Sequence, residues 1–138
     1  MIGIVIVTHA YLGEALVEAA RVIFDEAPES LVSVSIDINN DVDRLRNKIK
    51  DAIAAVDQNS GVLILTDMFG GTPSNLSYSF LEEGRIEVLS GVNLPVVIRA
   101  LNLRARVSSL HDLAVAVEEY GKKSITLASG ILKGNKRG

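Results

Sequence analysis

The chain of 138 residues contains no cysteine. This excludes disulfide bonds, thiol chemistry and zinc sites built on cysteine, and it is compatible with a reducing cytosol without proving one. There are only two histidines, and no acidic cluster supports either of them. No Gly-x-Gly-x-x-Gly pattern follows the first strand and no P-loop is present. We therefore expect neither a metal site nor a nucleotide or other organic cofactor.

Long apolar runs and a strong charge of one sign are also missing. The apolar runs have the length of strands, which predicts no transmembrane helix, and the N-terminus lacks the features of a signal peptide. The formal net charge of -3 is too small for a nucleic-acid surface or a polybasic membrane patch. We expect a cytoplasmic protein with a single domain over 1–130 and a flexible tail over 131–138.

The sequence contains two segments that are predicted to be strands with apolar residues on both faces. They cover 2–9 and 61–67 and end at His9 and Asp67. Half-polar strands are expected over 31–38 and 85–90, and a last strand over 124–128. Helical spacing predicts helices over 12–23, 42–56, 73–81, 93–103 and 110–121, with N-caps at Asn40 or Asp41, at Thr72 and at Ser109.

This alternation of strands and helices predicts an α/β fold with a mainly parallel sheet and helices on both faces. The two fully apolar strands should be central because helices cover both their faces, which gives the order 2-1-3-4. Ligands of such sheets bind at the carboxyl ends of the strands, where the strand order reverses. His9 and Asp67 are expected to meet there.

A histidine and a carboxylate in this position suit phosphoryl transfer. If Asp67 accepts a hydrogen bond from Nδ1 of His9, it fixes the tautomer and leaves Nε2 free as a nucleophile. A strand-end histidine alone would more simply satisfy a local carbonyl group. The matched Asp67 favours the catalytic interpretation, whereas His111 is assigned to the surface.

The turn after Asp67 supplies a candidate phosphate site. Gly70 and Gly71 permit close backbone approach, so their N–H groups could point into the crevice, and Thr72 suits the start of a helix. Taken alone, such a turn is more often structural. Thr8 and Thr66 could lend hydroxyl groups, although both residue types are also common in strands.

The residues described so far resemble the IIA component of the mannose/fructose/sorbose class of the bacterial phosphoenolpyruvate-dependent sugar phosphotransferase system (PTS). The resemblance covers essentially the whole chain, and its middle segment is specific. It rests on three segments: Ile4-Val5-Ile6-Val7-Thr8-His9-Ala10 with Leu12-Gly13, Thr66-Asp67-Met68-Phe69-Gly70-Gly71-Thr72-Pro73-Ser74-Asn75, and Ser90-Gly91-Val92-Asn93-Leu94-Pro95.

The resemblance implies a phosphotransferase that acts as a protein-histidine phosphoryl carrier. His9 would accept phosphate from the phosphocarrier protein HPr and pass it to a histidine of a IIB component, which serves the membrane components IIC and IID. Asp67 matches the acid that orients the active histidine. The family also implies a homodimer that exchanges its last strand, which adds antiparallel to the partner's sheet. No IIB domain follows in this chain, so we expect a separate acceptor protein.

Two questions stay open at this stage. The same His9 would be labelled in a regulatory phospho-switch, whose phosphorylated state is read by a binding partner instead of a transporter. A receiver-like domain is disfavoured because the first strand ends in Thr8 and His9, not in the acidic pair that would hold Mg²⁺. The sequence does not name a sugar, since IIA components contact phosphate and protein.

Overall fold

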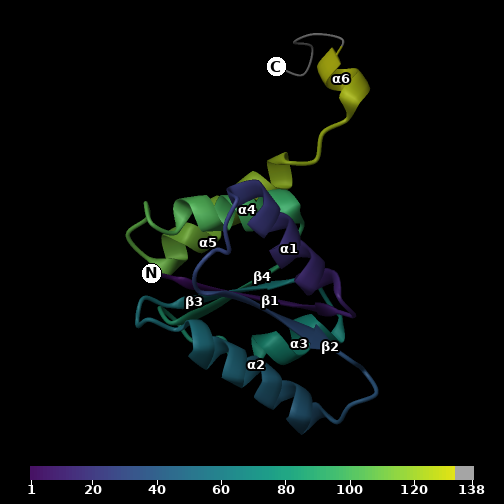
Figure 1. Ribbon diagram of the computed structural model, residues 1–138, viewed down its shortest axis with the longest axis vertical. Helices are drawn as coiled ribbons and strands as arrows, with labels where there is room; N and C mark the ends of the chain where they lie inside the picture. The colour runs from purple at the N-terminus through teal and green to yellow at the C-terminus, as the bar shows by residue number, and fades with distance from the viewer. Residues whose placement is uncertain (133–138) are drawn as a thin grey trace.

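A computed structural model describes residues 1–132 and shows strands and helices that alternate along the chain (Figure 1). Each predicted parallel strand and each of the five predicted helices is present, with shifts at some ends. In chain order the elements are β1 (Gly3–His9), α1 (Leu12–Phe24), β2 (Leu31–Ile36), α2 (Val42–Val56), β3 (Val62–Thr66), α3 (Thr72–Tyr78), β4 (Ile86–Ser90), α4 (Leu94–Leu103), α5 (Leu110–Lys123) and α6 (Ala128–Leu132).

The four strands form one parallel sheet in the order β2-β1-β3-β4. This confirms the predicted order and places the two fully apolar strands in the centre. The register pairs Gly3 of β1 with Val62 of β3, and His9 of β1 with Ile36 of β2. The carboxyl ends of β1 and β3 therefore lie at the same edge of the sheet.

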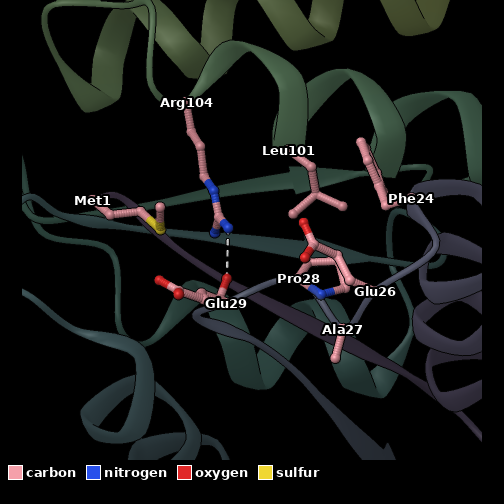
Figure 2. Close-up of a pocket in the computed structure, with 8 residues that line it drawn as sticks. All are labelled: Met1, Phe24, Glu26, Ala27, Pro28, Glu29, Leu101 and Arg104. Carbon is pink, nitrogen blue, oxygen red and sulfur yellow. Dashed lines mark hydrogen bonds between the residues drawn. The ribbon is translucent and has the colours of Figure 1, made fainter.

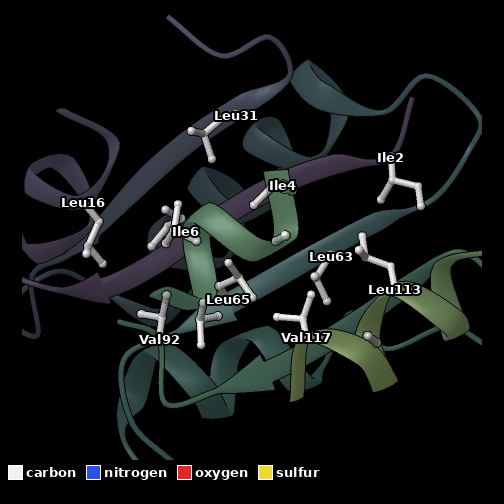
Figure 3. Packing of buried hydrophobic residues seen from close by; sticks show 14 of the residues in the cluster. Ile2, Ile4, Ile6, Leu16, Leu31, Leu63, Leu65, Val92, Leu113 and Val117 are labelled. Carbon is white, nitrogen blue, oxygen red and sulfur yellow. The ribbon is translucent and has the colours of Figure 1, made fainter. Parts of the chain in front are cut away.

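Helices cover both faces of the sheet, as the apolar pattern of the central strands requires. Helices α1, α4 and α5 lie on one face, and α2 and α3 lie on the other (Figure 1). Successive strand residues point to opposite faces, so β1 and β3 contribute to both cores. The first core is drawn in Figure 3 and includes Ile4, Ile6, Leu63 and Leu65, and the second includes Val5, Val7, Val62 and Ile64.

Three elements end more than one residue away from the predicted end, and one of them is α3, which ends at Tyr78 instead of residue 81. Strand β2 ends at Ile36 instead of residue 38, because Asp37 starts a turn in which its side chain accepts a hydrogen bond from Asn39. Helix α5 continues through Gly121 to Lys123. A Cβ atom at Gly121 would lie 2.9 Å from a methyl group of Val96, so this glycine permits close packing of α5 on α4 and does not end the helix.

The predicted last strand over 124–128 does not form in the single chain. Residues 124–127 have no regular structure, and α6 extends away from the body of the protein (Figure 1). A strand needs a neighbour for its backbone hydrogen bonds, and within residues 1–132 nothing pairs with this segment. Ile125 and Leu127 remain 82% and 68% exposed. The predicted tail begins inside α6, and residues 133–138 lie outside the described part.

At the amino edge of the sheet, opposite the strand ends of interest, Arg104 joins several loops. Its guanidinium is buried and donates hydrogen bonds to the carbonyl oxygens of Ile2, Glu29 and Ser30 beside a cavity of about 350 Å³ (Figure 2). Burial lowers the pKa of Arg104, and the charge of Glu29 opposes this shift.

In residues 1–132 no helix has both the length and the apolar character needed to cross a membrane.

Candidate active site

The structure brings His9 and Asp67 into direct contact at the carboxyl edge of the sheet. Nδ1 of the His9 ring lies 2.7 Å from Oδ2 of Asp67, and the same oxygen accepts a hydrogen bond of 2.9 Å from the backbone N–H of His9. The His9 side chain is 42% exposed and that of Asp67 10%. The carboxylate accepts from Nδ1–H, so the neutral ring presents an unprotonated Nε2 as a nucleophile.

Several donors surround the Asp67 carboxylate and stabilise its charged form. Burial acts to raise the pKa of Asp67, but hydrogen bonds from the backbone and ring of His9, the charge of that ring and the N–H of Met68 together lower the pKa below its ordinary value. The Met68 N–H donates to Oδ1 over 3.0 Å. Asp67 therefore stays ionised near neutral pH and can balance positive charge on the imidazole.

The two glycines after Asp67 have different roles. Gly70 has a φ of +89°, a left-handed conformation that favours glycine, and a Cβ atom there would meet nothing within 4 Å. At Gly71 a Cβ atom would lie 2.9 Å from Cε1 of His9. The predicted close approach of the Gly71 backbone is thus an approach to the imidazole ring of His9. A side chain at this position would occupy the space of the ring.

Helix α3 begins one residue earlier than predicted. Gly71 is the N-cap, with φ -87° and ψ 169°, and its carbonyl accepts the first helical hydrogen bond, from Asn75. Thr72 is therefore the first helical residue and not the N-cap, because Gly71 already has the extended backbone of a cap. No described residue accepts a hydrogen bond from the backbone N–H of Gly70, Gly71 or Thr72. Because α3 has only seven residues, these local N–H groups matter more than its dipole.

Thr8 is fully buried, so its hydroxyl does not line the crevice. Its Oγ1 accepts a hydrogen bond of 2.8 Å from the backbone N–H of Gly13 in the first turn of α1. Tyr11, the N-cap of that helix, makes no capping hydrogen bond with its side chain. Thr8 therefore supplies the missing acceptor for α1 and fixes the start of the helix that follows His9.

Thr66 is also fully buried, and it belongs to a group of residues that sequence reasoning missed. We call Thr66, Ser74, Ser90 and Tyr78 the hydroxyl cluster. The Thr66 hydroxyl lies 2.6 Å from that of Ser74 and 2.8 Å from that of Ser90, which is 2.8 Å from the Tyr78 hydroxyl. The signal in the sequence is weak, because these residues come from three separate elements and serine suits both helix ends and turns.

Large apolar side chains are exposed next to His9. Tyr11, two residues beyond the histidine, is 71% exposed, and Phe69 is 79% exposed. Met68 and Leu12 are exposed as well. Exposed apolar groups of this size are typical of a surface that meets another protein.

No metal centre is apparent in the part of the chain that the structure describes. Within residues 1–132, no group of three or more His, Cys, Asp or Glu side chains is arranged to hold a metal ion. His111 lies in the first turn of α5 and is exposed, as predicted. The helix is capped by Ser109, whose hydroxyl accepts a hydrogen bond from the backbone N–H of Asp112.

Comparison with known proteins identifies the family of this site. A sequence profile of the family described as PTS system fructose IIA component matches residues 3–118. The chain belongs to this family. This IIA component of the sugar phosphotransferase system is 32% identical over 130 residues to the PTS system fructose-specific EIIA component of Bacillus subtilis. The matched residues make up 94% of this chain and 88% of that protein.

Other relatives of this IIA component agree with the assignment. It is 30% identical over 125 residues to the PTS system mannose-specific EIIAB component of Escherichia coli, of which it spans 38%. The crystal structure of phosphotransferase system component EIIA from Streptococcus agalactiae superposes with a TM-score of 0.84 at 26% identity, over 94% of this chain and 99% of that one. The predicted family and the predicted α/β fold, with its parallel sheet in the order β2-β1-β3-β4, are confirmed.

Proposed function

We propose that this IIA component carries a phosphoryl group on Nε2 of His9, which it accepts from HPr and passes to a histidine of a IIB component in the cytoplasm. The observation that supports this most strongly is the 2.7 Å contact between Nδ1 of His9 and Oδ2 of Asp67. It holds one ring nitrogen in place and leaves the other at the surface.

The proposed reaction is a direct exchange between two nitrogen atoms. The lone pair of Nε2 attacks phosphorus, the new N–P bond forms, and the N–P bond to the donor histidine breaks with its electron pair returning to the donor ring. The proton on Nδ1 stays in place, so the His9 ring becomes positively charged while it carries the phosphoryl group. The negative charge of Asp67 balances the positive charge of the ring and lowers the energy of the phosphorylated state.

The loop over 67–71 is the proposed site for the phosphoryl oxygens. The N–H groups of Gly70, Gly71 and Thr72 have no acceptor among the described residues, and Gly71 lies against the His9 ring. Backbone N–H groups in such a turn bind anions without a charged side chain. The exposed Tyr11 and Phe69 suit docking of a protein on either side of the histidine.

We also propose a homodimer in which the segment over 124–128 pairs with the β4 edge of a second copy. Strand β4 pairs only with β3 among the described strands, and on its other edge the described residues form one isolated bridge, between Glu82 and Ile86 at the start of the strand. The exposed apolar residues Ile125 and Leu127 are two positions apart, the spacing of residues on one face of a strand.

The molar mass measured by light scattering should be that of a dimer, and a variant with aspartate at both Ile125 and Leu127 should be monomeric. A monomeric wild type would contradict this.

Labelling with phosphate tests the proposed carrier role. The protein is incubated with radioactive phosphoenolpyruvate, enzyme I and HPr, and should acquire an acid-labile, alkali-stable label that a IIB protein removes. His9→Ala should abolish the label. His111→Ala is the matched control because it removes the other histidine, which is exposed in the first turn of α5, and it should label fully. Full labelling of His9→Ala would refute the assignment.

A further inference from the structure

The hydroxyl cluster lies directly behind the loop over 67–71, and the proposed reaction assigns it no role. We propose that Ser74 is a positioning residue for phosphoryl transfer, which acts by holding the backbone of Met68 and through it the Asp67 carboxylate. This inference rests on the proposed function of His9, because it concerns the orientation of that ring. Ser74 is fully buried and therefore does not touch the phosphoryl group.

The hydrogen bonds of Ser74 have a direction that follows from counting protons. The Ser74 hydroxyl donates to the carbonyl oxygen of Met68, which can only accept. A hydroxyl has one hydrogen, so the Ser74 oxygen can act only as an acceptor toward its other neighbours, the hydroxyls of Thr66 at 2.6 Å and Ser90 at 3.2 Å. Tyr78 donates to or accepts from Ser90 and closes the group. Ser74 thus connects the buried cluster to the loop.

The backbone of Met68 transmits this connection to the catalytic pair. Its carbonyl is held by Ser74, and its N–H donates to Oδ1 of Asp67. The other carboxylate oxygen, Oδ2, holds both the backbone and the ring of His9. The N–H and the carbonyl of Met68 belong to the two peptide groups that meet at its Cα atom, so a shift of this backbone would move the N–H, turn the carboxylate and weaken its contact with Nδ1.

The loop has few other anchors that could replace Ser74. The side chains of Met68 and Phe69 are exposed, and Gly70 contributes no side chain at all. The ring of Phe69 makes a tilted aromatic contact with Tyr78, with the two ring centroids 6.1 Å apart. The position of the loop therefore depends on the hydrogen bond from Ser74 more than on packing.

Nitrogen-15 NMR of the imidazole tests the inference without any phosphate donor. In the unphosphorylated wild type, the neutral His9 ring should show a protonated Nδ1 and an unprotonated Nε2. In Ser74→Ala a substantial share of the other tautomer should appear. Ser77→Ala is the matched control, because Ser77 lies on the same helix, is equally buried, and donates only within α3, to the carbonyl of Pro73 at 2.7 Å. It should leave the His9 signals unchanged.

Transfer kinetics extend the test. Ser74→Ala should slow transfer from phospho-HPr to His9 by roughly tenfold, the effect of one hydrogen bond of about 1.4 kcal/mol, and Ser77→Ala by less than about twofold even if both lose similar stability. In an Asp67→Ala background the Ser74→Ala change should have no further effect, because the two residues act in series.

Each outcome decides the inference. Unchanged tautomers in Ser74→Ala, equal effects of the two serine changes, or additive losses with Asp67→Ala would each overturn it. If no variant and not even the wild type accepts phosphate, the proposed carrier function fails instead, while the NMR comparison still decides whether Ser74 positions His9.

Discussion

Replacing Asp67 by asparagine keeps the shape of the side chain that contacts His9. The change removes its negative charge and turns one of its two hydrogen-bond acceptors into a donor. The native carboxylate accepts three hydrogen bonds, two at Oδ2 from His9 and one at Oδ1 from Met68. Asparagine has nearly the same size but offers one acceptor oxygen and one NH₂ donor. No orientation of the amide can accept from both residues, so one side of the group must face a donor.

The two amide orientations have different consequences for His9. With its oxygen toward His9, Asn at position 67 keeps the tautomer but places NH₂ against the Met68 N–H. With NH₂ toward His9, it repels the backbone N–H and favours a ring with an unprotonated Nδ1 and a protonated Nε2, which is not a nucleophile. Both orientations also remove the negative charge that balances the phosphorylated ring.

The expected loss follows from the hydrogen bonds at stake. A hydrogen bond to a charged group contributes about 1.5–3 kcal/mol. Loss of that amount only in the transition state slows transfer roughly ten- to hundredfold. The measurement is rapid-mixing transfer from labelled phospho-HPr to Asp67→Asn. The control is Asp57→Asn, since Asp57 is a carboxylate at the opposite edge of the sheet that forms an ion pair with Arg85. Transfer by Asp67→Asn within about twofold of wild type would refute the reasoning.

The same substitution has a signature in the pH dependence of stability. The pKa of Asp67 is lower in the folded protein than its ordinary value. A carboxyl group with a depressed pKa contributes stability above the ordinary carboxyl pKa of about 3.9, and this contribution is lost as the pH falls through the folded value. Urea unfolding should therefore show wild type more stable than Asp67→Asn at pH 6, and the difference in unfolding free energy should shrink as the pH falls below the ordinary carboxyl pKa of about 3.9 and through the lower folded pKa. A constant difference across that range would show that the charge is not responsible.

Further substitutions distinguish residues that shape the site from residues that only support the fold. Gly71→Ala should slow transfer by about tenfold or more because its Cβ would lie 2.9 Å from Cε1 of His9, while urea unfolding changes little. Gly70→Ala should do the reverse, losing about 1–2 kcal/mol of stability to its left-handed backbone with near-normal transfer kinetics. Thr8→Val should cost about 1–3 kcal/mol in the same unfolding assay, because it leaves the Gly13 N–H without its acceptor. The opposite pattern for the two glycines would contradict the assigned roles.

Sequence reasoning succeeded where one pattern had one physical cause. Strands that are apolar on both faces must be central, which gave the order β2-β1-β3-β4 and brought His9 and Asp67 to one edge. Capping at Ser109 also followed, because a serine before an apolar helical stripe has few other uses. These features depend on local pattern and burial, which a single sequence expresses directly.

The errors arose where tertiary contacts override a local signal. Gly121 has the usual signature of a helix end, but close packing on Val96 is what requires a glycine there. The hydroxyl cluster was missed because its hydrogen bonds join residues 8 to 24 positions apart. A short helix whose buried side includes Ser74 and Ser77 does carry a hint, since buried hydroxyls need internal partners.

The contact between His9 and Asp67 also depends on a stagger that no local pattern specifies. The register pairs Val7 with Thr66, so continued pairing would place Thr8 beside Asp67. The carboxylate instead reaches one residue further, to the backbone and ring of His9. A register shift of one residue would exchange the two faces of the strand and expose the apolar residues of β1 to the wrong core. The cores that fix the register therefore also fix the catalytic geometry, which links packing deep in the sheet to the chemistry at its edge.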